Sequence, residues 1–174
     1  MSALIYIIQS LLTIALFVVL ARLFLQWSRA DFRNPICQAI VRLTNPLIVP
    51  LRRVLPPMGK VDTASVVAVI LVAIVEVVII TSLGGFTLDP VLVLRLAALE
   101  IARTSLWFYF YAIFLYALIS MVAPGGYTPF HSLLTSLCEP VLRPIRRLIP
   151  SIAGIDLSPL WAGIAIQAIL ILLR

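Results

Sequence analysis

Long apolar stretches constrain the fold of this chain more than any other feature of its sequence. Residues 3–27 contain a single charge, Arg22, and two glutamines, Gln9 and Gln26, and residues 63–82 contain a single charge, Glu76. A helix needs about 20 apolar residues to cross a bilayer, and soluble domains do not contain such runs. Because 63% of the residues are hydrophobic and only 11% are charged, polar groups cannot cover the surface. We therefore expect an all-α membrane protein.

Two further apolar stretches, residues 100–122 and 158–173, bring the predicted transmembrane helices to four. The third stretch is rich in aromatic residues, and Asp89 followed by Pro90 is a good start for a helix that leads into it. The fourth stretch is short but close to the lower limit for crossing a bilayer.

An internal repeat relates the two halves of the chain. A shift of 94 positions aligns eight identical residues within 28 ungapped positions. Each copy holds two spans, so both copies should have the same orientation, as parallel tandem repeats. We place the first repeat at residues 1–84 and the second at residues 85–174. The identical pairs are Pro35 and Pro129, Leu43 and Leu137, Pro46 and Pro140, Pro50 and Pro144, Arg52 and Arg146, Arg53 and Arg147, Pro56 and Pro150, and Asp62 and Asp156.

Between its two spans, each repeat has an amphipathic stretch followed by a hinge of prolines and arginines. Polar residues recur at helical spacing from Asn34 onward, which indicates a helix lying in the membrane interface. This helix should begin at Pro35 or Pro129 and end before the next proline. Later prolines should forbid a continuous helix and bend the chain. The hinge prolines are Pro46, Pro50 and Pro56 in the first copy and Pro140, Pro144 and Pro150 in the second.

Most of the basic residues follow the first and third spans. Loops rich in arginine and lysine stay on the cytoplasmic side of a membrane. The sequence therefore predicts a multi-pass membrane protein with both hinges on the cytoplasmic side and both termini on the outer side.

The hinge arginines Arg52, Arg53, Arg146 and Arg147 allow three interpretations. They can be simple cytoplasmic anchors, they can bind an anionic phospholipid headgroup or an acidic partner, or they can line an ion path. The following aspartates, Asp62 and Asp156, are either helix N-caps or partners in a salt bridge back to the arginines.

Three further charges fall inside or beside the predicted spans, and such residues are functional candidates. Arg22 is near the inner end of its span and should snorkel to the interface. Glu76 is too short to do so, which predicts either an ion pair with Arg103 or a protonated carboxyl. Neither Arg22 nor Glu76 has a charged counterpart in the other copy.

The sequence argues against enzyme chemistry, metals and cofactors. His131 is the only histidine, and Cys37 and Cys138 have no metal-ligand spacing. There is no phosphate-binding glycine loop and no basic, aromatic soluble face for nucleic acid.

The two hinge segments, "NPLIVPLRRVLPP" and "EPVLRPIRRLIP", each followed by an aspartate and an apolar span, resemble the YggT family of bacterial integral membrane proteins. The second copy departs from the first in having Glu139 for Asn45 and Ser151 for Pro57. The resemblance implies a location in the bacterial inner membrane, so that both termini would be periplasmic, and it implies no catalytic site. It implies loose links to osmotic tolerance and potassium uptake, to cell division or chromosome placement, and, for plastid relatives, to haem attachment on a b-type cytochrome.

Two functions follow as expectations. The first is a non-enzymatic membrane module for osmotic tolerance or potassium homeostasis, which would need a homo-oligomer to enclose a pore. The alternative is a scaffold or assembly factor whose paired arginines hold anionic lipid or a membrane protein partner at the cytoplasmic face.

Overall fold

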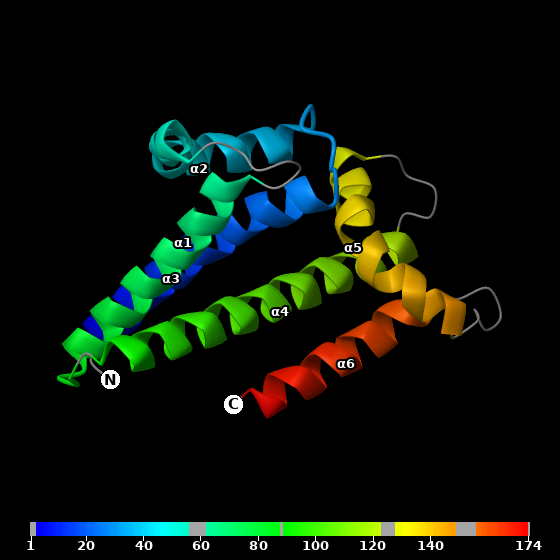
Figure 1. The fold of residues 1–174 in the computed structure, drawn as a ribbon. Helices are drawn as coiled ribbons and strands as arrows, with labels where there is room; N and C mark the ends of the chain where they lie inside the picture. The colour runs from blue at the N-terminus through cyan, green and yellow to red at the C-terminus, as the bar shows by residue number, and fades with distance from the viewer. Residues whose placement is uncertain (1–2, 56–61, 88, 123–127, 149–155, 174) are drawn as a thin grey trace. The chain divides into compact units, whose positions relative to one another are not determined.

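The structure is a computed structural model that describes residues 3–55, 62–87, 89–122, 128–148 and 156–173. These residues form helices and connecting segments, with no strand among them (Figure 1). The helices are α1 (Ala3–Trp27), α2 (Pro35–Val54), α3 (Thr63–Leu83), α4 (Pro90–Val122), α5 (Pro129–Leu148) and α6 (Ser158–Leu172).

Three helices, α1, α3 and α4, are long and apolar enough to cross a membrane. The fourth predicted span, α6, is apolar but has only 15 residues. The predicted class of all-α membrane protein is therefore confirmed, whereas the fourth span stays a prediction. Helix α4 starts at Pro90, directly after Asp89, whose carboxylate accepts a hydrogen bond from the Val91 N–H at 3.2 Å.

Packing divides the chain into two compact units. Unit 1 comprises Met1–Leu23 and Ile40–Ser105, and unit 2 comprises Phe24–Ala39 and Leu106–Arg174. Helices α1, α2 and α4 each contribute to both units. These units therefore follow packing rather than the sequence repeat, and the repeat boundaries at residues 84 and 85 stay a prediction.

In unit 1, α3 returns alongside α1 in the opposite direction (Figure 1). The buried face of α3 is built from small residues, Ala64, Ser65, Ala68 and Ala73, all of which are fully buried. Small side chains allow the backbones of neighbouring helices to approach closely, which is the main source of helix packing inside a membrane.

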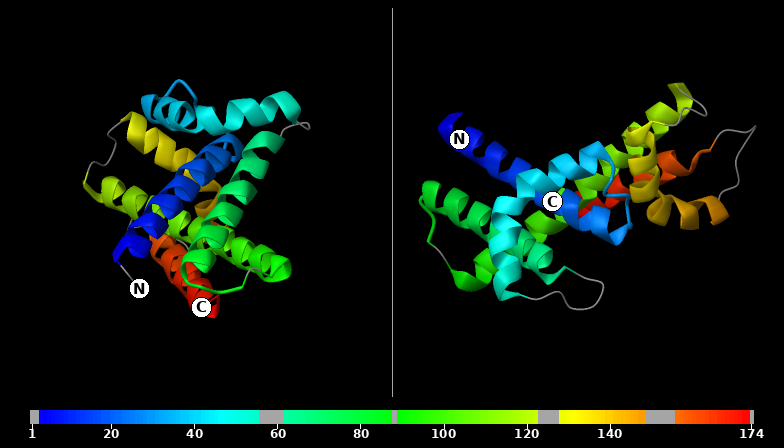
Figure 2. Two further views of the ribbon diagram at one scale, coloured as in Figure 1. Left: turned by 90° about the vertical axis from the view of Figure 1, so that its left-hand side faces the viewer. Right: turned by 90° about the horizontal axis from the view of Figure 1, so that it is seen from above.

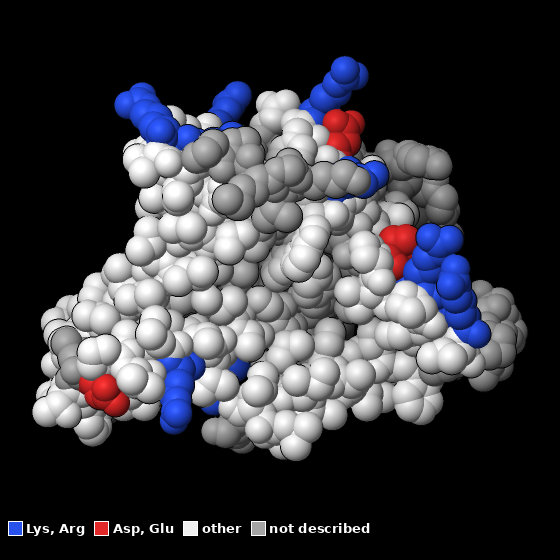
Figure 3. Space-filling view, in the orientation of Figure 1, with Lys and Arg blue, Asp and Glu red and all other residues white. Residues whose placement is uncertain are grey.

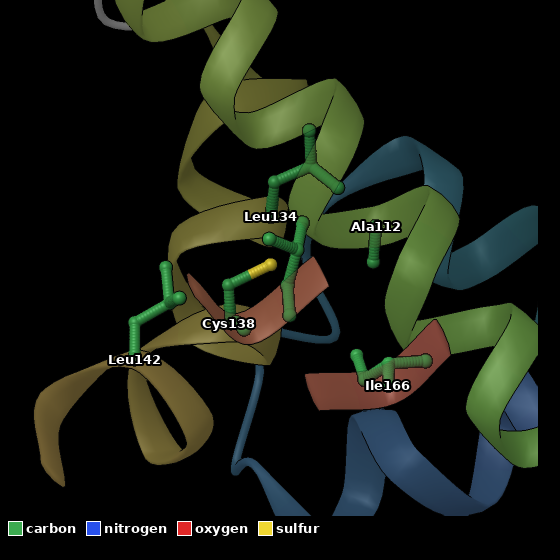
Figure 4. Packing of buried hydrophobic residues seen from close by; sticks show 7 residues of the cluster. Ala112, Leu134, Cys138, Leu142 and Ile166 are labelled. Atoms are coloured by element: carbon green, nitrogen blue, oxygen red, sulfur yellow. The ribbon is translucent and has the colours of Figure 1, made fainter. Parts of the chain in front are cut away.

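In unit 2, a cluster of buried apolar residues joins the second half of α4 to α5 and α6 (Figure 4). Its labelled members show the three sources. Ala112 lies on α4, Leu134, Cys138 and Leu142 lie on α5, and Ile166 lies on α6. The α5 residues recur every four positions, so one face of this helix supplies the contact.

The expectation that the hinge prolines end the helices is wrong. Helix α2 continues through Pro46 and Pro50, and α5 continues through Pro140 and Pro144. Both ribbons nevertheless change direction partway along their length (Figure 2). Pro56 and Pro150 lie outside the described residues.

The position of these prolines on the helix surface explains why the helices continue. The two prolines of each pair are four residues apart, so they lie on one face, and that face is exposed. A proline frees the carbonyl four residues before it. Here the freed carbonyls of Arg42 and Pro46 lie on exposed positions of α2, where they are not forced into a buried, unpaired state. The opposite face remains packed, with Ile48 fully buried.

Candidate functional site

In unit 1, an ion pair joins the end of α2 to the beginning of α3. The Arg52 guanidinium contacts both carboxylate oxygens of Asp62, and its Nε donates to Oδ1 at 3.3 Å. The Ser65 hydroxyl donates to Asp62 Oδ2 at 2.7 Å. The hydrogen bond with Asp62 raises the pKa of Arg52. This bidentate arrangement is the geometry in which arginine binds carboxylates best.

The equivalent arginine of unit 2, Arg146, has more partners. Its Nε donates to Asp156 Oδ2 at 2.7 Å, its Nη1 to Glu139 Oε2 at 2.8 Å, and its Nη2 to the Tyr116 hydroxyl at 3.1 Å. The guanidinium therefore connects α4, α5 and the residue pair that precedes α6. Partial burial of Arg146 by itself would lower the pKa of this group, but its interactions with Asp156 and Tyr116 outweigh burial and raise it.

The carboxylate of Asp156 is held ionised by its neighbours. Partial burial by itself would raise the pKa of this group, but hydrogen bonds from Ser158 and from Arg146 outweigh burial, and the net effect lowers it. The Ser158 N–H donates to Asp156 Oδ1 at 2.9 Å. Asp156 thus ties the first residue of α6 to the last turn of α5.

Of the two interpretations left open for the aspartates, the structure contains the salt bridge. Asp62 occupies the N-cap position of α3, but its side chain makes no cap hydrogen bond. Asp156 comes one residue before Leu157, the N-cap of α6. In both copies, the arginine and its aspartate are separated by ten residues.

The second arginine of each pair has a different environment. Arg53 and Arg147 are exposed on the last turns of α2 and α5. Among the described residues, neither forms an ion pair. Consecutive helical residues point about 100° apart, so the neighbour of the paired arginine faces away from its aspartate. On the face shown in Figure 3, charged side chains gather at a few places and most of the surface is uncharged.

Arg22 lies elsewhere than expected. Its side chain is only 3% exposed, so it does not snorkel to the surface. Its Nη1 donates to Thr44 Oγ1 at 2.7 Å and to Asn45 Oδ1 at 3.0 Å. The reason is that α2 lies against the end of α1 and supplies polar atoms where the prediction placed water or headgroups.

Glu76 is also buried, and its partner is not the predicted one. The Thr13 hydroxyl on α1 donates to Glu76 Oε1 at 2.6 Å, and Oε2 has no hydrogen-bond partner in the described part of the chain. The predicted ion pair between Glu76 and Arg103 is therefore wrong, whereas the alternative, a protonated carboxyl, stays a prediction. The antiparallel packing of α1 on α3 places Thr13 opposite the carboxyl, which sequence reasoning could not foresee.

Several partners in these clusters were missed from the sequence. Glu139 precedes Arg146 by seven residues, which is two helical turns, and this spacing could have revealed the pair. Thr44 and Tyr116 carry no comparable signal, because their contacts come from another helix.

Cys37 and Cys138 are free, buried thiols. Within the described residues, no group of three or more histidine, cysteine, aspartate or glutamate side chains could hold a metal ion.

Apolar helices that could cross a bilayer, linked by shorter proline-containing helices whose arginines pair with the following segment, define a polytopic helical membrane protein. The sequence profile of the CCB3/YggT family matches residues 1–83 and 96–174, and the chain belongs to this family.

Relatives of this chain are known from several bacteria. The uncharacterized protein PA0392 of Pseudomonas aeruginosa is 42% identical over 170 residues, which cover 97% of this chain and 86% of that protein. The uncharacterized protein YggT of Escherichia coli is 33% identical over 160 residues, covering 92% and 83%. A protein of Vibrio alginolyticus is 34% identical over 172 residues, covering 96% and 91%. No solved structure matches the chain.

Proposed function

We propose that this protein is a non-enzymatic scaffold of the bacterial inner membrane that binds anionic phospholipid through its arginine hinges. In this proposal α6 is the fourth span, and α2 and α5 lie in the cytoplasmic interface. Both termini are periplasmic. The scaffold would hold a second copy of the chain or another membrane protein beside the bound lipid.

One observation carries this proposal, namely the division of each arginine pair into two roles. Arg52 and Arg146 are held by aspartates, whereas Arg53 and Arg147 are exposed and form no ion pair among the described residues. An exposed guanidinium on a rigid helix end can bind a lipid phosphate bidentately. Each basic residue near an anionic leaflet contributes about 1 kcal/mol.

Thiol labelling tests the membrane topology. Val54 and Leu148 directly follow Arg53 and Arg147, and they are 77% and 81% exposed. In a background without Cys37 and Cys138, we would introduce Val54→Cys or Leu148→Cys and apply a membrane-impermeant maleimide. Both variants should react in inverted vesicles and stay unlabelled in spheroplasts. Labelling of the two positions from opposite sides would refute the proposed topology.

Lipid retention tests the binding role. Native mass spectrometry of the purified protein would count bound phosphatidylglycerol in the wild type and in the double variant Arg53→Gln, Arg147→Gln. We expect the double variant to retain less phosphatidylglycerol, with phosphatidylcholine unchanged. Arg95→Gln is the matched control, because Arg95 is an exposed arginine at the start of α4, outside the hinges. Equal retention by all three proteins would contradict the proposal.

A second candidate function, in potassium homeostasis, rests on Glu76. Its side chain is 3% exposed, and its Oε2 atom has no hydrogen-bond partner among the described residues. A buried carboxyl of this kind is a candidate site for an ion or a proton. Potassium flux into liposomes should then fall in Glu76→Gln and persist in the double arginine variant. If wild-type liposomes show no flux above empty ones, this candidate is excluded.

A further inference from the structure

The buried guanidinium of Arg22 lacks a counter-ion. Its hydrogen bonds go to neutral oxygens, those of Thr44, Asn45 and the Val41 carbonyl at 3.4 Å. Its Nε atom is buried without a hydrogen-bond partner in the described residues. All 7 Asp and Glu residues of the chain lie in the described ranges, and none forms an ion pair with Arg22. A buried unpaired charge costs several kcal/mol, which favours the binding of an anion.

The charged groups that act on Arg22 leave this part of unit 1 positive. They are Arg52 and Asp62, so two arginines share a single carboxylate and the cluster has a net charge of +1. Asp62 is engaged with Arg52 through both of its oxygens. Its side chain accepts hydrogen bonds from Arg52 and Ser65 and none from Arg22.

The equivalent cluster of unit 2 has the opposite charge. At the position of Arg22 it has Tyr116, and at the position of Asn45 it has Glu139. Its one arginine, Arg146, is paired with two carboxylates, those of Glu139 and Asp156, which gives a net charge of −1. Unit 2 therefore has a carboxylate, that of Glu139, for which unit 1 has no equivalent.

We propose that unit 1 contains an anion site in which Arg22 and Arg52 bind a phosphate group next to Asn45, and that unit 2 has no such site because Glu139 takes the place of the anion. The Arg52 side chain is 45% exposed, so a ligand can reach the Arg52 end of the cluster from the surface. The phosphate can belong to a phospholipid headgroup or be free phosphate, since both present the same oxygens to a guanidinium. The inference extends the proposed lipid-binding function but uses a different residue set from Arg53 and Arg147.

The substitution Asn45→Glu tests this site because it gives unit 1 the carboxylate of unit 2. The readout is the thermal unfolding midpoint in detergent, followed by helical circular dichroism, because unit 1 contains α3 and most of α1 and α2. One arm exchanges chloride for phosphate at constant ionic strength. The other adds phosphatidylglycerol or, as a reference, phosphatidylcholine.

We expect the wild-type midpoint to rise by about 3–5 °C when a phosphate ligand saturates the site. Asn45→Glu should unfold at a higher temperature than the wild type in chloride and gain nothing from either ligand. Glu139→Gln is the matched control in unit 2 and should keep the wild-type response. Arg22→Gln should lose the response to both ligands.

Each outcome distinguishes the sources or overturns the site. A response to both phosphate and phosphatidylglycerol supports a site for the phosphate group itself, and a response to phosphatidylglycerol alone supports a headgroup site. The inference falls if neither ligand stabilises the wild type, or if Asn45→Glu responds as the wild type does. If the response disappears in Arg53→Gln, Arg147→Gln but survives in Asn45→Glu, the proposed function stands without this site.

Discussion

The Nε atom of Arg146 lies 2.7 Å from the Oδ2 atom of Asp156. The pair joins the last turn of α5 to the beginning of α6, and the same ten-residue relationship joins α2 to α3 through Arg52 and Asp62. An arginine–aspartate clasp at the end of each proline-containing helix is thus a recurrent element of this protein.

Substitution of the two arginines of one pair should have different effects on the stability of the protein. Arg146→Gln removes the donor shared by Asp156, Glu139 and Tyr116. Because the ion pairs are partly exposed, we expect the free energy of unfolding to fall by about 1 kcal/mol. This corresponds to a decrease of about 2–4 °C in the unfolding midpoint. Arg147→Gln should leave the midpoint within about 1 °C of the wild type. Equal decreases for both variants would argue against the clasp.

Acid should weaken the clasp through Asp156. Its pKa is lowered in the folded state, so its contribution to stability is present above the ordinary value of 3.8 and is lost as the pH falls below that value. The unfolding midpoint of Asp156→Asn should therefore be lower than that of the wild type at neutral pH. The two midpoints should converge in acid. A constant difference across this range would show that the carboxylate is not ionised in the clasp.

Alkali should destabilise unit 2 through Cys138. Burial raises the pKa of this thiol from 9.0 to about 12, so the neutral form is favoured in the folded protein. The stabilisation is complete below 9.0 and is lost as the pH rises toward about 12, because the unfolded chain then releases the proton first. Helical circular dichroism during heating should show a shallower alkaline decline for Cys138→Ala than for the wild type. Equal alkaline declines for Cys138→Ala and the wild type would contradict this prediction.

The hydrogen bond between Thr13 and Glu76 should stabilise the packing of α1 on α3. Thr13→Val leaves the buried carboxyl without its donor, and we expect a loss of about 0.6–1.7 kcal/mol, the range typical of bonds between membrane helices. Thr13→Ser keeps the hydroxyl and should retain most of the stability. A Thr13→Ser variant as unstable as Thr13→Val would assign the effect to packing of the methyl group instead.

The apolar runs alone were enough to place α1 and α3. The predicted spans at residues 3–27 and 63–82 correspond to Ala3–Trp27 and Thr63–Leu83. The starts of the proline-containing helices at Pro35 and Pro129 were also predicted, because proline fits the first helical turn. These features depend on local composition and on the backbone preference of proline, and both can be read from the sequence.

The partners of the charged residues were less accessible to sequence reasoning. The ion pair of Arg52 with Asp62 was one of two open interpretations, and both residues lie within one copy of the motif. Arg22 and Glu76 instead take their partners from other helices, Thr44 and Thr13 respectively. Such contacts depend on the rotation and the depth at which two helices pack, and the spacing of residues along the sequence does not encode either quantity.

The sequence by itself determined that this is a helical membrane protein of the YggT family with two arginine-bearing proline segments, because apolar length and motif spacing are properties of the chain. Only the tertiary structure decided that α2 and α5 continue through their prolines, since this depends on which face is exposed. It also decided that one arginine of each pair is held by an aspartate. The burial of Arg22 without a counter-ion likewise follows from how α2 packs on α1, and not from any residue pattern.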